Sequence, residues 1–308
     1  MCRLSPQAPC YLAWDSLHRY GYRVLSPEVY VSGPTSMFLN ANGITLHYLD
    51  WGGRGRPAVL VHATGFCAQL WGPYAERLSP WFRVTAPDMR GHGDSDKPAG
   101  PYRWLDLGAD LTGFLDALDL RDALIMGHSA GGTAAVVAAA ERPERVSRLA
   151  LLEPTILLSR RAQTGDPGPQ MAQRARRRRA VWESREQMAQ AYRTRETFAN
   201  WDDASFRAYV GGCTADTPDG AVELKCPPEV EAQFYENREA FDPWPYVRRV
   251  ACPTLIVLGE KGVPMDSEPV KRWRALRPLD QVRSIAGGSH FAPQEKPGEV
   301  VDLLIRFV

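Results

Sequence analysis

The feature that most constrains the fold is the segment Gly127-His128-Ser129-Ala130-Gly131. An apolar run at residues 123–126 precedes it, and an Ala-rich run without helix breakers follows it up to residue 141. Small residues around a serine let the chain turn sharply from a strand into a helix, a strained geometry in which larger flanks would clash. The segment therefore predicts a strand, a tight turn that presents Ser129, and a helix whose free N–H groups favour negative charge beside it.

Short apolar runs alternate with helical patterns along most of the chain. Runs of this length are typical of strands buried on both faces of a parallel sheet. Between two of them, Leu107, Leu111, Phe114 and Leu118 follow the spacing of one helix face. Parallel strands need crossover connections, so the pattern predicts an α/β fold with a mostly parallel, doubly wound sheet flanked by helices. The expected strands are residues 57–61, 82–87, 123–126, 148–152, 254–258 and, more weakly, 281–285.

The pattern divides the chain into three parts. Residues 1–36 contain four prolines and show no period, so we expect an N-terminal extension there. A hairpin around Asn42-Gly43 opens the expected α/β core, which comprises residues 37–153 and 246–308. Residues 154–245 interrupt the alternation with a polar stretch, which we expect to form a helical cap over one end of the sheet.

The expected cap contains the run Arg174-Ala175-Arg176-Arg177-Arg178-Arg179. A charge run of this kind usually forms the solvated face of a helix, and we prefer that interpretation. The alternative is a binding site for an anionic group. The sequence leaves both interpretations open.

Composition narrows the class of protein. The 37 Lys and Arg residues nearly balance the 36 Asp and Glu residues, which excludes a global basic field for nucleic acid. The six cysteines are scattered without metal-ligand spacing, so we expect reduced thiols. The chain also lacks a phosphate-binding Gly-rich loop, a dinucleotide fingerprint and an H-E-x-x-H motif, so we expect neither a metal nor a cofactor. No stretch approaches the roughly 18 apolar residues of a membrane span, and the first residues lack a signal-peptide core. We expect a cytoplasmic monomer or homodimer without nucleic-acid or membrane partners.

A nucleophilic serine needs a base, and His290 is the best placed of the six histidines. It lies in Gly287-Gly288-Ser289-His290-Phe291, a loop of small residues between the last expected strand and the last expected helix. The other histidines lie in the extension, the hairpin, a strand end, a turn and the position beside Ser129. A serine followed much later by a histidine is the order found in α/β enzymes with this turn. We therefore predict Ser129 as nucleophile and His290 as base.

Two backbone N–H groups must face the oxyanion that such a serine creates. Ala130, which follows the nucleophile, supplies one of them in our prediction. The other is expected from the loop His62-Ala63-Thr64-Gly65-Phe66, which follows the strand at residues 57–61. Thr64 is the preferred donor, and Gly65 or Phe66 is the alternative.

Together these residues resemble the α/β-hydrolase-fold superfamily, in particular its serine hydrolases with a helical cap. The resemblance covers about residues 38–308 and rests on the His62 loop, the turn at residues 88–95, the Ser129 turn and the His290 loop. In that superfamily the turn at 88–95 is structural, so Asp88, Arg90 and His92 receive no catalytic role. Haloalkane dehalogenases and epoxide hydrolases of this fold carry aspartate where this chain has Ser129, which argues against both.

The acid of the triad departs from the family pattern. The family usually has Gly-x-x-Asp after the penultimate strand, whereas this chain has Gly259-Glu260-Lys261-Gly262. Glu153 ends the strand at 148–152, a position from which some members, including haloalkane dehalogenases and zearalenone lactonases, take their acid. We predict Glu153, with Asp266 and Glu260 as alternatives and a dyad without an acid as a further one.

The resemblance implies a serine hydrolase that cleaves carboxylic esters or lactones through an acyl-enzyme, with a small-molecule substrate. A carbon–carbon bond hydrolase or other acyl transfer with the same triad is the alternative, and a hydrolase-like signalling receptor is a third reading. The superfamily places its substrate between sheet and cap. The residues expected to contact it are Phe66, Trp71, His128, Trp182 and Phe291, with Trp201 and Trp244 as further lid aromatics.

Overall fold

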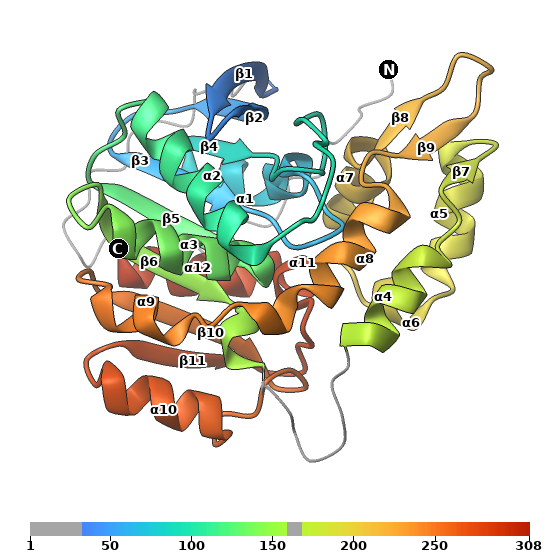
Figure 1. Cartoon of the computed structure of the whole chain (residues 1–308). Coiled ribbons are helices and arrows are strands. Elements are labelled where there is room, and N and C mark those ends of the chain that lie inside the picture. Colours follow the sequence, from blue (N-terminus) through green and yellow to red (C-terminus); the bar gives the residue numbers. More distant parts are fainter. Residues whose placement is uncertain (1–32, 159–167) are drawn as a thin grey trace, which may run out of the picture. The chain divides into compact units, whose positions relative to one another are not determined.

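The computed structural model describes residues 33–158 and 168–308, so most of the expected N-terminal extension lies outside the described residues. Its centre is an eight-stranded sheet in the order β1-β2-β4-β3-β5-β6-β10-β11 (Figure 1). The antiparallel hairpin of β1 and β2 joins β4 antiparallel, and the strands from β4 to β11 are mutually parallel. This confirms the mostly parallel α/β fold. The strands are β1 (Thr35–Ala41), β2 (Ile44–Gly52), β3 (Pro57–Val61), β4 (Arg83–Pro87), β5 (Ala123–His128), β6 (Val146–Leu152), β10 (Thr254–Gly259) and β11 (Gln281–Ile285).

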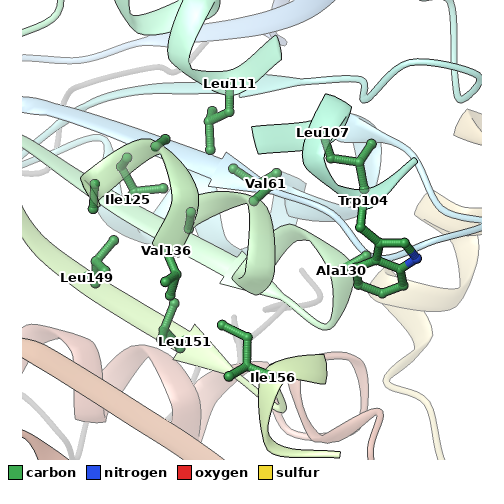
Figure 2. Packing of buried hydrophobic residues seen from close by; sticks show 14 of the residues in the cluster. Val61, Trp104, Leu107, Leu111, Ile125, Ala130, Val136, Leu149, Leu151 and Ile156 are labelled. Atoms are coloured by element: carbon green, nitrogen blue, oxygen red, sulfur yellow. The ribbon is translucent and has the colours of Figure 1, made fainter. Parts of the chain in front are cut away.

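Helices cover both faces of this sheet. Residues of β3 separate by position: Val59 and Val61 pack in one apolar cluster, and Ala58 and Leu60 pack in the other. The first cluster includes residues of α2 (Trp104–Ala117), α3 (Ala130–Glu141), α9 (Trp244–Arg249) and α10 (Glu268–Leu276), and Figure 2 shows part of it. The second includes residues of α1 (Gly72–Leu78), α11 (Ala292–Glu295) and α12 (Pro297–Phe307). Successive strand residues face opposite sides, so apolar runs without alternation fill both interfaces.

The chain between β6 and α9 is not part of this sheet. We call residues 168–243 the insertion. It contains helices and a small antiparallel sheet in the order β7-β9-β8, and the sequence did not predict this sheet. None of the helices in the described part of the chain combines the length and apolarity of a membrane span. After η3 (Thr155–Leu157) come α4 (Gly168–Arg176), β7 (Val181–Trp182), α5 (Arg185–Arg193), α6 (Glu196–Ala199), α7 (Asp203–Gly212), β8 (Thr214–Asp216), β9 (Val222–Leu224), α8 (Pro228–Glu236) and η4 (Arg238–Ala240).

The insertion packs on the loops at the carboxyl ends of the strands. An apolar cluster joins Ala63, Phe66 and Leu70, which follow β3, to aromatic residues of the insertion such as Tyr192 and Tyr209. The helix α7 contacts η2 (Ala68–Trp71), and Figure 1 shows the insertion beyond the end of the sheet to which the arrowheads point. Ligands of open α/β sheets bind at this end, so a functional site is expected where the insertion meets the strand ends.

Candidate active site

Ser129 lies on a strained turn between β5 and α3. Its backbone angles are φ 54° and ψ −114°, and its N–H donates to Leu152 O at 3.0 Å. A Cβ on Gly127 would lie 2.4 Å from Gly131 O, and a Cβ on Gly131 would lie 2.3 Å from Val61 O. A side chain at either position would overlap neighbouring backbone atoms, so both positions of this turn require glycine.

His290 lies in the loop after β11, and its Nε2 is 3.1 Å from Ser129 Oγ. Glu295 holds the loop by accepting hydrogen bonds from the N–H and the hydroxyl of Ser289. His128 Nε2–H donates to His290 O at 3.0 Å, which fixes the backbone of the histidine itself. The imidazole of His290 is thus placed within proton-transfer reach of the serine.

Glu153 directly follows β6 and is 1 % exposed. Its Oε2 is 3.4 Å from His290 Nδ1, and its Oε1 accepts the Gly259 N–H at 2.6 Å. Its backbone is left-handed, with φ 44°, and its N–H donates to Val257 O. The carboxylate is therefore anchored on the neighbouring strand β10 while its second oxygen faces the histidine.

The two alternative acids lie elsewhere. Glu260 accepts the N–H of Gly287 at 2.7 Å, and Asp266 is exposed. Of the three carboxylates, Glu153 is the one with a hydrogen bond to His290 in the described structure. Gly262 occupies the usual aspartate position, and a Cβ there would lie 2.0 Å from Glu153 Oε1. The missing side chain at 262 therefore makes room for the carboxylate of Glu153.

The loop after β3 presents its N–H groups unequally. The Gly65 N–H donates to His92 Nε2 at 2.9 Å, and the Phe66 N–H donates to Ala63 O at 3.1 Å. Among the described residues, no acceptor receives the N–H of Thr64 or that of Ala130. These two N–H groups are therefore available to a ligand, whereas those of the two alternative donors are already used.

Buried neutral histidines support this loop from below. His92 Nδ1–H donates to Arg90 O, which leaves Nε2 as the acceptor for Gly65. Burial lowers the pKa of His92 to about 3 and that of His128 to about 3, with neighbouring histidines adding to the effect. Burial also lowers the pKa of His62, although Asp88 opposes this. All three side chains therefore act as uncharged hydrogen-bonding groups at neutral pH.

Asp88 is buried in the turn that the resemblance describes as structural. Burial alone would raise its pKa, but the hydrogen bond from His47 and further contacts lower it to about 2. Asp88, His47 and Asp94 form the one group of possible metal ligands in the described part of the chain. The Asp88 carboxylate also accepts the N–H groups of Ala68 and Asp94, so its oxygens already hold the turn together.

An aromatic group lies beside the serine. Phe66 contacts the rings of His128, Trp201, Tyr209 and Phe291 at centroid distances of 5.4 to 6.2 Å. The structure therefore brings together two of the predicted substrate contacts, Phe66 and Phe291, with Trp201 from the insertion.

Other predicted contacts are placed less directly. Trp71 is 1 % exposed and packs on Tyr74 in the sheet core, and His128 is fully buried and used in holding His290. Trp182 lies in the insertion under Arg179. Trp244 belongs to α9 and lines a cavity of about 710 Å³ that also touches Thr133 and Thr155, and neither Ser129 nor His290 lines it. That cavity lies behind the serine turn, because Thr155 Oγ1 donates to Ser129 O.

One further group lies at the site, and the sequence pointed to it only through the arginine run that contains Arg178. Arg178 and Glu231 form an ion pair across the insertion, and both lie against Gly65 of the loop that follows β3. The two residues are 53 positions apart, so no local pattern connects them.

A serine on a strand-to-helix turn, a histidine after the last strand and a carboxylate at the sheet end define the site type of the α/β hydrolases. The model of the Alpha/beta hydrolase family matches residues 58–303, and the chain belongs to this family.

Curated relatives support that assignment along most of the chain. N-formylmaleamate deformylase of Pseudomonas putida is 28% identical over 83% of this chain and 89% of its own length. 3-Oxoadipate enol-lactonase 2 of Acinetobacter baylyi is 25% identical over 84% of this chain and 91% of its own. Among solved structures, E-2-(acetamidomethylene)succinate hydrolase superposes with a TM-score of 0.78 at 23% identity, covering 89% of this chain and 98% of the other. The family and its relatives make this chain a hydrolase.

Proposed function

We propose that this protein is a serine hydrolase that cleaves carboxylic esters or lactones through an acyl-enzyme. The observation that carries the proposal is the continuous contact from Ser129 Oγ to His290 Nε2 and from His290 Nδ1 to Glu153 Oε2. Such a chain makes a weak nucleophile reactive, because the base accepts the serine proton and the acid stabilises the imidazolium that results.

The reaction begins when Ser129 Oγ attacks the acyl carbon while His290 takes the hydroxyl proton. The carbonyl oxygen becomes negative and is stabilised by the N–H groups of Thr64 and Ala130. Collapse of the tetrahedral intermediate breaks the acyl–oxygen bond, and His290 gives its proton to the leaving alcohol. His290 then deprotonates a water molecule, which attacks the acyl-enzyme, releases the carboxylic acid and restores the serine.

The names of the relatives span two kinds of acyl bond. The enol-lactonase supports an acyl–oxygen bond as the target, and its similarity extends over most of both chains. The deformylase favours a second candidate, hydrolysis of an N-acyl group by the same steps. The triad serves either reaction, since only the leaving group differs.

Hydrolysis of p-nitrophenyl esters of increasing acyl length tests the proposal. We expect turnover by the wild-type protein and a fall in kcat of about 10³-fold or more in Ser129→Ala, because the nucleophile is lost. Ser147→Ala is the matched control and should keep wild-type rates, because the hydroxyl of Ser147 donates only to backbone carbonyls. Equal rates in Ser129→Ala and wild type, or no turnover of any ester by folded wild type, would overturn the proposal.

A further inference from the structure

The arginine run of the insertion divides into residues with different surroundings. Arg176 is exposed and pairs with Glu229 and Glu236, as expected for a solvated helix face. Arg178 instead turns inward, and its side chain is only 17 % exposed. The two interpretations of the run therefore apply to different residues, and Arg178 is the one that needs a separate explanation.

Arg178 lies beside the proposed oxyanion loop. A Cβ on Gly65 would lie 3.3 Å from a terminal nitrogen of Arg178 and 3.0 Å from Glu231 Oε1. Gly65 is the neighbour of Thr64, whose N–H is free to face the substrate oxygen. The guanidinium therefore lies against the residue that follows the proposed oxyanion donor Thr64.

The hydrogen bonds around Arg178 show an excess of donors. Arg178 donates to Glu231 and, at 2.7 Å, to the hydroxyl of Tyr209, while Tyr235 O–H donates to Glu231 at 3.3 Å. The hydroxyl of Tyr192 lies near the guanidinium, and this side chain is fully buried. Among the described residues, no acceptor receives the O–H of Tyr192.

Buried polar groups are nearly always paired, so this excess calls for an acceptor. Glu231 is the one carboxylate in the group, and it is already shared by Arg178 and Tyr235. Trp201 adds another unpartnered donor, its buried indole N–H, in the aromatic cluster that contacts Phe66. A group with two acceptor oxygens would satisfy a guanidinium and a phenol at once, and carboxylate has that geometry.

We propose that Arg178 and Tyr192 form a subsite for a carboxylate of the substrate, with Glu231 and Tyr209 positioning the guanidinium. The proposal rests on the proposed function, because it places the carboxylate a few carbon atoms from the acyl carbon attacked by Ser129. It makes the preferred substrates half-esters or lactones of dicarboxylic acids. A purely structural role for the ion pair is the alternative that the experiment must separate.

Paired substrates separate these roles. The monomethyl and dimethyl esters of butanedioic, pentanedioic and hexanedioic acids differ in one charge, and pH-stat titration follows both. The readout is the ratio of kcat/KM for each monoester to that for its diester. We expect Arg178→Met to lower this ratio by about 10- to 100-fold, the size of a lost charge-assisted hydrogen bond. Tyr192→Phe removes an O–H that has no acceptor in the described structure, and we expect it to lower the ratio by about 3- to 10-fold with little change in stability.

Arg176→Met is the matched control, because it removes an arginine from the same run on the solvated side. It should leave the ratio at the wild-type value. Equal losses on monoesters and diesters in Arg178→Met, with no change in ratio in Tyr192→Phe, would show a structural ion pair and overturn the subsite.

A binding measurement keeps this test independent of turnover. Calorimetric titration of the wild-type protein with pentanedioate should show binding that weakens at least 10-fold in Arg178→Met and is unchanged in Arg176→Met. If no ester is hydrolysed but this binding pattern is observed, the proposed function fails and the subsite stands. If esters are hydrolysed but pentanedioate binds equally to both variants, or to neither and not to wild type, the subsite fails alone.

Discussion

In the sheet core, residues that pack in one cluster repeat every second position along a strand, as Val59 and Val61 of β3 do. In the insertion, the decisive contacts join distant residues, such as Arg178 and Glu231, which are 53 positions apart. The core places Ser129, His290 and Glu153 on loops anchored by backbone hydrogen bonds, whereas the insertion supplies aromatic and charged side chains above them. We therefore propose that the core carries the chemistry and that the insertion governs the choice of substrate.

The largest predicted effect comes from a change of the acid, Glu153, and it tests whether the core carries the chemistry. Glu153→Gln keeps the shape that Gly262 accommodates but removes the charge that stabilises the imidazolium, so we expect kcat to fall by about 10²- to 10⁴-fold. Spectrophotometric assay of the p-nitrophenyl ester that the wild type hydrolyses fastest measures kcat for both proteins.

Asp266→Asn and Glu260→Gln are the controls for this change, and each should stay within about threefold of wild type. Inactivation by Asp266→Asn with an active Glu153→Gln would assign the acid to the loop after β10 and contradict the placement described above.

The core could be predicted from sequence because its signals are local. The Asn42-Gly43 turn, the apolar runs and the small residues around Ser129 each act within a few positions, and their strands are confirmed. The contact of Glu153 with His290 matched its position at a strand end, since the carboxyl ends of adjacent parallel strands meet at one sheet edge.

The insertion could not be predicted to the same depth. Its strands β7, β8 and β9 have only two or three residues each, too few for a period to be visible. The inward turn of Arg178 depends on Glu231, a partner in α8. The sequence predicts Trp71 in the substrate wall, whereas the structure packs it in the core. These outcomes depend on tertiary packing, which composition and local spacing do not encode.

The second prediction concerns the pH dependence of stability, which the buried histidines of the core should control. The pKa of His92 and of His128 is about 3 in the folded protein, below the value of about 6.5 in the unfolded chain. The unfolded state therefore binds protons first, so this stability is complete above about pH 6.5 and is lost as the pH falls toward 3. Each histidine should contribute a slope of about 1.4 kcal/mol per pH unit between those values.

Urea unfolding at pH 7, 6, 5 and 4.5 measures this slope. His92→Gln retains a donor and an acceptor for Arg90 and Gly65 but does not titrate. The slope of its unfolding free energy against pH should therefore be smaller than that of the wild type by about 1.4 kcal/mol per pH unit. An unchanged slope in that variant would show that His92 does not carry the pH dependence.

The last prediction concerns a contact between the core and the insertion. Cys67, at the start of η2, lies with its Sγ 2.6 Å from that of Cys213, at the end of α7. Diamide should oxidise this pair to a disulfide, taking two electrons and two protons, and stabilise the protein by about 2 to 4 kcal/mol. Burial and the neighbouring Cys67 raise the pKa of Cys213, so the reaction should be slow at neutral pH.

Peptide mass mapping after diamide treatment identifies the cross-link, and Cys67→Ser is the control that should abolish it. Reaction at Cys226 or Cys252 in place of this pair would contradict the placement of α7 against η2.

The central claim is that Ser129 and Glu153 act through His290 as one unit, and a double-mutant comparison tests it most directly. We would measure kcat/KM on one p-nitrophenyl ester for Ser129→Ala, Glu153→Gln and the combined variant. Without the nucleophile the acid has nothing to assist, so the combined variant should match Ser129→Ala within about threefold. Losses that multiply, leaving the double variant about 10²-fold or more below Ser129→Ala, would show that the two residues act independently and would contradict the account.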